Sequence, residues 1–257
     1  MNANPFGRPS PGGAGEVSSK LISQLAVIAL KLRLADQTSV ACDVKATGDM
    51  LKGSIGPVTV KGRGWQSNLG LTCMAIEATV DTCKLDISKV MANRKLVLTE
   101  PAMGKAMIAL SSQDFGNFIT HPLLRPPALT QSSSSGNDGA QLTFLKDGSR
   151  VNPKDGSVTF FASYMGSKYE CRLSRASSGE SNAVITLQSV EKSEDANKIT
   201  AELGETLTDF FNKMTFELDG TFLSFRDMMV TDKGREPNVM LSLNIKVKKF
   251  PSPGLDF

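Results

Sequence analysis

The closing stretch of the chain has a branched apolar residue at every second position over nine positions, a pattern typical of a β-strand with one wet face. Val239, Leu241, Leu243, Ile245 and Val247 occupy every second position, and side chains two residues apart in a strand point to the same side. Such a strand needs neighbouring strands for its backbone groups and an apolar layer for its buried side. The chain must therefore build a sheet with one face exposed to water.

Many other segments share the composition of strands and are separated by turns that contain glycine. They are rich in Val, Thr, Ile and Phe, residue types that favour extended backbone. The expected strands fall at residues 38–50, 56–68, 69–87, 95–100, 102–110, 140–148, 157–166, 167–176, 182–192, 215–232 and 238–250. Short connections between them predict antiparallel pairing.

Two longer segments place apolar residues at helical spacing. The stripe of residues 16–36 consists of Val17, Leu21, Leu25, Ile28 and Leu32. The stripe of residues 195–214 has the same steps and consists of Ile199, Leu203, Leu207, Phe210 and Met214. Steps of four, four, three and four are typical of an amphipathic α-helix. Helices and antiparallel strands in each half predict an α+β protein.

A third, short helix is expected between residues 111 and 122. Ser111 or Ser112 is a good N-cap, and Asp114 places a negative charge at the positive end of the helix. Pro122 prevents continuation. Phe115, Phe118 and Ile119 then fall on one side of about two turns.

Segments rich in Pro, Gly or Ser divide the chain into two comparable halves of one domain. Residues without periodicity and rich in Pro, Gly or Ser separate these halves from their surroundings. The expected boundaries are a flexible leader at 1–15, a first half at 16–124, a linker at 125–139, a second half at 140–250 and a tail at 251–257.

Charge and hydropathy exclude two classes of protein. The net charge is only +3, and no basic cluster is interleaved with aromatic residues as a nucleic-acid interface requires. No apolar run reaches the roughly 18 residues that a transmembrane helix needs. We therefore expect no nucleic-acid partner and no transmembrane segment.

Cysteine and histidine, the residues that most often bind metals or take part in nucleophilic catalysis, are sparse. The four cysteines lack the short spacing of a zinc site, and Cys73 and Cys83 would lie about 33 Å apart on one strand. Free thiols are expected, with no metal and no cofactor. His121 is the one histidine, and no G-x-S-x-G motif supplies a nucleophile. The sequence predicts that the protein is not an enzyme; a hydrolase using His121 is the hypothesis to be tested against this.

Apolar residues point to both sides of several expected strands. Phe160 and Phe161 are adjacent, as are Met228 and Met229, so each pair faces two directions. The chain has eleven Met and thirteen Phe but only two Tyr and one Trp, which favours an adaptable apolar lining. Two interpretations stay open: a sheet covered on both faces by the protein itself, or a groove or surface for acyl chains.

Residues 48–124 resemble the LmeA-like phospholipid-binding family, formerly a domain of unknown function. The resemblance is carried by "LKGSIGPVTVKGRG" at 51–64, "LDISKVM" at 85–91, "RKLVLTEPAMGKAMIAL" at 94–110 and "SSQDFGNFITHPLL" at 111–124. Family members have Asp-Leu-Asn and then Ser-Pro-Leu-Leu in the last element. Here Phe115 stands in for the Leu, Gly116 for the Asn, and Thr120-His121 precede Pro122. The similarity continues through residues 207–232 into the closing strands.

The resemblance implies a fold and a place in the cell. The fold is a strongly curved antiparallel sheet wrapped around long amphipathic helices, similar to tubular lipid-binding folds. The place is the thylakoid or stromal membrane surface of a plastid such as the chloroplast. The implied function is non-enzymatic, membrane-peripheral phospholipid binding. The alternative is a structural or accessory subunit docked on a larger, multi-subunit membrane complex, for example one of photosynthesis.

Two sets of residues are the expected contacts with a lipid or partner. The apolar set consists of Phe115, Phe118, Ile119, Leu123, Leu124, Phe160 and Phe161. The set expected to contact anionic headgroups consists of Lys246, Lys248 and Lys249. Lysines at a strand end also protect a sheet edge from aggregation, which is the simpler interpretation of the second set.

Overall fold

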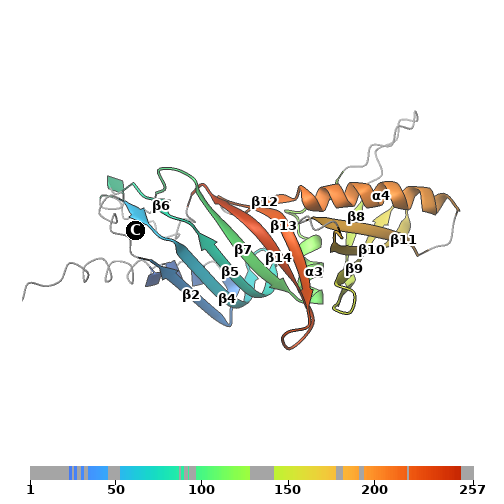
Figure 1. Ribbon diagram of the computed structural model, residues 1–257, viewed down its shortest axis with the longest axis horizontal. Helices are drawn as coiled ribbons and strands as arrows, with labels where there is room; N and C mark the ends of the chain where they lie inside the picture. Colours follow the sequence, from blue (N-terminus) through green and yellow to red (C-terminus); the bar gives the residue numbers. More distant parts are fainter. Residues whose placement is uncertain are drawn as a thin grey trace, which may run out of the picture.

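The computed structural model describes residues 34–45, 53–86, 97–127, 142–177, 182–190, 194–218 and 220–249, with isolated positions at 23–31 and 88–92. Most of this described chain is β-strand, arranged in one large and one small antiparallel sheet (Figure 1). The expected leader at 1–15, residues 128–139 of the expected linker and the expected tail at 251–257 lie outside the described residues.

Within the described residues the large sheet has eight strands, and it curls into a half-barrel. Its strands, in sheet order, are β1 (Leu34–Asp36), β4 (Val58–Ser67), β5 (Thr72–Val80), β7 (Ala102–Leu110), β14 (Asn238–Val247), β13 (Thr221–Thr231) and β12 (Thr215–Leu218), and β2 (Ser39–Val44) also pairs with β4. A separate two-stranded pair consists of β3 (Ser54–Ile55) and β6 (Cys83–Lys84). The two halves of the sequence share the large sheet, because β7 of the first pairs with β14 of the second.

The apolar alternation predicted for residues 239–247 is confirmed in β14. Val239, Leu241, Leu243, Ile245 and Val247 are all buried. Their cross-strand neighbours on β7, from Leu110 to Ala102, are small or apolar, so the buried side of this sheet continues across the pair. Burial of these side chains is the main force that fixes the register, because a slip by one residue would expose all of them.

The opposite side of the large sheet, which we call the open face, is exposed. It carries as its larger exposed or half-exposed side chains Asp43, Lys61, Arg63, Glu77, Met103, Lys105, Met107, Glu217, Phe222, Arg226, Asp227, Met229, Met240 and Lys246. The register places them together, since Met107 lies opposite both Glu77 and Ser242, and Met103 lies opposite Lys246.

The small sheet consists of β8 (Thr143–Asn152), β9 (Ser157–Tyr164), β10 (Ser167–Arg175) and β11 (Ala183–Ser189) in the order β11-β10-β9-β8. Helix α4 (Glu194–Asn212) lies along its edge strand β11 (Figure 1). The side-chain amide of Asn212 accepts from the backbone N–H of Ala183 and donates to its carbonyl, both at 2.9 Å. Thr208 Oγ1 accepts from the N–H of Ile185 at 2.9 Å. The helix thus satisfies edge groups that would otherwise attract another strand.

Helix α3 (Ser112–Ile119) confirms the expected short helix and lies between the two sheets (Figure 1). Ser111 is its N-cap and forms a capping box with Asp114. The helix packs on β8 of the small sheet and also contacts β5, β7 and β14 of the large sheet. It therefore fixes how the two sheets meet.

The expected fold, a sheet wrapped around long amphipathic helices, is wrong. The described chain is mostly strand; α3 has eight residues, and α4 lies beside the small sheet without being enclosed by either sheet. The physical reason is visible on α4, whose Leu203 and Leu207 are buried while Glu202 and Glu205 are exposed. A helix with one apolar stripe and one acidic side needs a single apolar partner surface and cannot be surrounded by one.

The helix expected at 16–36 is described only in part. Isolated positions between 23 and 31 are helical, but Leu34–Asp36 forms β1, so the predicted helix end at Asp36 is wrong. Pairing of β1 with the end of β4 holds these residues in extended backbone. The remaining positions of that expected helix lie outside the described residues.

Candidate functional site

Three of the four aromatic residues expected to contact lipid form the junction between α3, α4 and the small sheet instead of a surface. Phe115 and Phe160 are fully buried, with ring centroids 5.9 Å apart. Phe118 lies 5.9 Å from Phe216 of β12, and Phe160 lies 6.0 Å from Phe211 of α4. These rings stabilise the protein by burying large apolar areas against one another. The structure brings three of the expected residues together, and their partners are side chains of the same chain.

The remaining expected apolar residues divide between core and surface. Ile119 and Leu124 are buried, whereas Leu123 is 39% exposed. Phe161 points away from Phe160, is half-buried, and has the Lys168 ammonium 4.2 Å from its ring centroid. Only Leu123 and Phe161 of this set are thus accessible to a ligand from outside.

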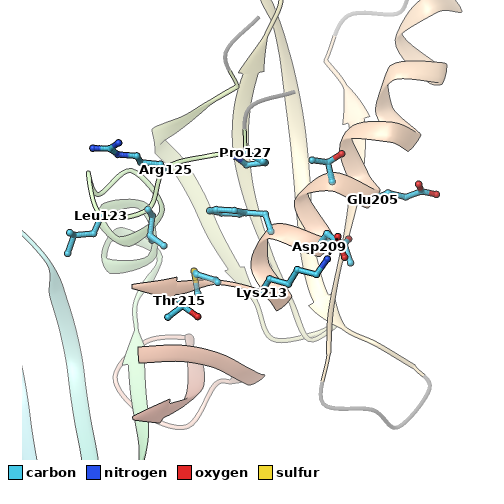
Figure 2. Close-up of a pocket in the computed structure, with 12 residues that line it drawn as sticks. Leu123, Arg125, Pro127, Glu205, Asp209, Lys213 and Thr215 are labelled. Carbon is cyan, nitrogen blue, oxygen red and sulfur yellow. Dashed lines mark hydrogen bonds and ion pairs between the residues drawn. The ribbon is translucent and has the colours of Figure 1, made fainter. Parts of the chain in front are cut away.

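A hollow of about 920 Å³, wide open to solvent, lies beside Leu123, between the segment that follows α3 and the last turns of α4 (Figure 2). Its lining consists of Leu123, Leu124, Arg125, Pro127, Glu205, Thr206, Thr208, Asp209, Phe210, Lys213, Met214 and Thr215. We call it the α4 cavity. Its volume is in the range of sites that hold small organic ligands.

The lining of the α4 cavity is apolar within and charged at its rim. Leu124, Phe210 and Met214 are buried or half-buried, and Met214, the last residue of the predicted stripe, lies two residues after the end of α4 at Asn212. At the rim, Lys213 Nζ lies 2.5 Å from a carboxylate oxygen of Asp209 (Figure 2). Arg125 is exposed and has no ion-pair partner among the described residues. An apolar interior with Arg125 at one end of the rim and the Glu205 carboxylate on the α4 side suits an amphiphile whose anionic head lies beside Arg125.

Sequence reasoning found one wall of the α4 cavity and missed the other. Leu123 and Leu124 were expected contacts, but the wall formed by residues 205–215 was interpreted only as a helix stripe. The two walls are about eighty residues apart in the chain, so no local pattern joins them. The sequence signal for the second wall is the end of the apolar stripe, because its last two residues, Phe210 and Met214, line the hollow.

His121 has a structural role that occupies both ring nitrogens. Its Nδ1 accepts from the backbone N–H of Leu123 at 3.2 Å, so its Nε2 carries the proton and donates to the carbonyl of Leu69 at 3.0 Å. The ring is 6% exposed and holds the end of α3 against a turn of the large sheet. A proton shuttle needs a free nitrogen facing a nucleophile, and this geometry offers none.

The lysines expected to contact headgroups lie together at the end of β14. Lys246 is on the open face, opposite Met103 and Phe222. The Lys248 ammonium lies 4.2 Å from the ring centroid of Phe222, and Lys249 is exposed beside Gly220. They are surface residues, separate from the α4 cavity.

A second hollow, of about 630 Å³, lies on the open face itself. Its cationic lining residues are Lys61, Arg63, Lys105 and Arg226, and its one acidic residue is Glu77. No cation of this set was singled out from the sequence, because the four come from three different strands. The polar positions within each alternating strand indicate which residues face water, but the sequence alone does not show which strands are neighbours.

Comparisons with known proteins do not assign this chain to a class of protein. No family model, no curated protein and no solved structure matches the chain. Within the described part of the chain, no three His, Cys, Asp or Glu side chains gather in a way that would hold a metal ion. Nor is any described helix long and apolar enough to cross a membrane.

Proposed function

We propose that the protein is a non-enzymatic, membrane-peripheral protein that binds phospholipid, with the α4 cavity as its lipid site. The observation that carries the proposal is the combination of an apolar interior and a charged rim in a hollow of about 920 Å³. An acyl chain that enters would remove its methylenes from water, and each buried methylene contributes about 0.8 kcal/mol. A few methylenes are enough for reversible binding.

Arg125 is the residue that we propose for the anionic headgroup. Its guanidinium is exposed at the rim and free of ion pairs with described residues, whereas Lys213 is already paired with Asp209. A guanidinium presents a planar fork of donors that matches two phosphate oxygens. The headgroup would therefore lie at the end of the cavity formed by the segment after α3.

The membrane that we propose is the thylakoid or stromal surface of a plastid, as the family resemblance implies. The alternative function, an accessory subunit docked on a larger membrane complex, is favoured by one observation: Met103, Met107 and Met229 are 44–55% exposed on the open face. Methionine-rich surfaces adapt to protein partners as well as to lipid. Lipid content and complex membership separate the two functions.

The test of the proposal is native mass spectrometry of the protein purified from its own membranes, combined with displacement of a fluorescent phosphatidylglycerol. We expect bound phospholipid, and Arg125→Glu should weaken the fluorescent lipid about tenfold because a charged hydrogen bond is lost. Arg150→Glu, on an exposed position of β8 outside the cavity, is the matched control. Membership in a large complex with no lipid released on denaturation would establish the alternative.

A further inference from the structure

The hollow on the open face of the large sheet, which we call the trough, has a floor of small side chains. Ala75 and Ala109 lie opposite each other on β5 and β7, with Ser242 on the next strand β14, and Ala41 and Ser39 lie on β2 beyond β4. Longer side chains surround this floor, among them Lys61, Arg63, Lys105, Met107 and Arg226. The hollow thus comes from side-chain size on a continuous sheet, whose backbone groups are already paired.

The charge of the trough is strongly one-sided. It is lined by four cations and one carboxylate, and Glu77 is paired with Lys61 at 2.9 Å. Arg63, Lys105 and Arg226 are exposed and form no ion pair within the described part of the chain. Three cations without an ion-pair partner among the described residues lie over one hollow, while the carboxylates Asp43 and Asp227 of the open face lie outside its lining, so the hollow itself favours anionic groups.

Exposed apolar side chains of the same face line the trough at Met107 and extend beyond it at Met103 and Met229. Met103, Met107 and Met229 are 51%, 44% and 55% exposed, and Met229 lies opposite Met240 of the trough lining. Large apolar side chains gathered on one exposed face indicate an interaction surface. Unbranched, flexible Met side chains can enter the headgroup layer of a bilayer without a fixed complementary shape.

We propose that the open face docks on an anionic lipid bilayer, with phosphates over Arg63, Lys105 and Arg226 and the methionines among the headgroups. This inference deepens the proposed function, on which it rests for the presence of a membrane. An interface for one protein partner is expected to contain Tyr or Trp anchors; none is among the described lining residues, and the nearby Trp65 donates its indole N–H to the Ser39 carbonyl of the protein itself. Phosphates in a fluid surface can move to meet cations that are spread over three strands.

The docking is tested by sedimentation with vesicles of phosphatidylcholine alone and of phosphatidylcholine with 30 mol% phosphatidylglycerol, as a stated probe composition. The wild-type protein should bind only the anionic vesicles. Binding should fall as salt rises from about 0.05 to 0.5 M, because the Debye length shortens and the attraction between the cations and the lipid phosphates is screened. Arg63→Glu/Lys105→Glu should weaken binding at least about tenfold, since each basic residue near an anionic surface contributes about 1 kcal/mol.

A matched control uses the same two changes of charge outside the trough. Lys233→Glu/Arg235→Glu lies in the exposed connection between β13 and β14 and should leave vesicle binding within about twofold of wild type. Thermal unfolding of both double variants should match wild type, because all four positions are exposed. Equal losses in the two double variants would overturn the proposal, since only net charge would then matter.

The outcomes also distinguish this inference from the proposed function. A trough variant that keeps its co-purified lipid but no longer binds vesicles supports the docking. A wild-type protein that carries lipid in the α4 cavity yet ignores anionic vesicles overturns the docking alone. Binding to immobilised poly-glutamate through Arg63 and Lys105, with none to vesicles, overturns it in favour of an acidic protein partner.

Discussion

Thr72 Oγ1 on β5 donates a hydrogen bond to Oδ1 of Asp114 in the first turn of α3. The side chain of Asn117, one turn further along the helix, donates to the same Thr72 oxygen at 3.0 Å. The second carboxylate oxygen of Asp114 accepts from the backbone N–H of Ser111 at 3.0 Å. One threonine therefore connects the helix at the sheet junction to the large sheet, through an acid that also caps that helix.

The first prediction concerns this connection. Thr72→Val keeps the shape of the side chain but removes its hydroxyl, which leaves Asp114 and Asn117 each short of a partner. We expect the free energy of unfolding to fall by about 1–2 kcal/mol, the cost of a lost hydrogen bond to a charged group. Urea unfolding followed by circular dichroism measures it. Thr186→Val, at an exposed position of β11, is the control and should change little.

The second prediction concerns the packing of α3 on β8. A Cβ at Gly116 would lie 2.4 Å from the carbonyl oxygen of Lys146, a backbone atom that cannot move away cheaply. Gly116→Ala should therefore destabilise the protein by about 1–2 kcal/mol, although alanine is the better helix former. In α4, a Cβ at Gly204 would lie 3.2 Å from the carbonyl oxygen of Ile185.

Gly204→Ala is thus the matched control, with the same substitution in a buried helical glycine facing a strand carbonyl. We expect its unfolding free energy to stay within about 1 kcal/mol of wild type. Equal losses at Gly116 and Gly204 would show that approach distance is not the cause. The result also bears on the family resemblance, because the Asn of that family would bring the same Cβ clash at position 116.

The third prediction uses two adjacent phenylalanines that face opposite sides of β9. Phe160→Ala should cost about 3–5 kcal/mol, because Phe160 is fully buried among the rings of Phe115, Phe144 and Phe211. Phe161→Ala removes a half-buried ring and should cost clearly less. Thermal and urea unfolding measure both. A Phe160→Ala protein of normal stability but altered lipid content would instead mean that this ring contacts lipid.

The fourth prediction concerns the reactivity of two cysteines. All four cysteines are free thiols. Burial, and then the Asp114 carboxylate, raise the pKa of Cys73 to about 11, and burial followed by Glu170 raises the pKa of Cys171 to about 12. The thiolate is the reactive form. At pH 8 the native protein should therefore alkylate Cys73 about a hundredfold more slowly than unfolded protein does, and Cys171 more slowly still.

Pulsed iodoacetamide labelling with mass spectrometry of each peptide provides the measurement. The sign for stability follows from the same shift: the unfolded thiols lose protons near pH 9, and the folded ones lose them only at higher pH. Folding stability should thus be unaffected by these groups below about pH 8 and should decline from about pH 9 to 11. Native Cys73 that labels as fast as in 6 M guanidinium, a standard unfolding concentration, would contradict the prediction.

The sequence predicted the elements better than their arrangement. Helix α3 begins after its Ser111 cap and stops before Pro122, and α4 follows the stripe that contains Leu203 and Leu207, because caps, breakers and apolar periodicity act within a few residues. The fold class was wrong since a stripe on a helix shows that one side must be buried but not by which partner.

The candidate sites show the same limit. Leu123 and Leu124 could be chosen from the sequence as apolar residues just after a short helix, but the opposite wall of the α4 cavity comes from residues 205–215. Phe115 and Phe160 were chosen for their apolar character, which is equally the character of core residues. Only contacts between distant segments distinguish an apolar residue in the core from one at a binding surface.

By itself the sequence determined that this chain forms amphipathic strands with one wet face, a capped short helix and a longer helix with a single apolar side. These follow from side-chain periodicity and local hydrogen bonding, which any short segment carries within itself. Tertiary structure alone decided that β7 pairs with β14, and that Arg63, Lys105 and Arg226 share one trough. The reason is that strand order depends on which apolar surfaces pack best over the whole chain, and no local pattern encodes that choice.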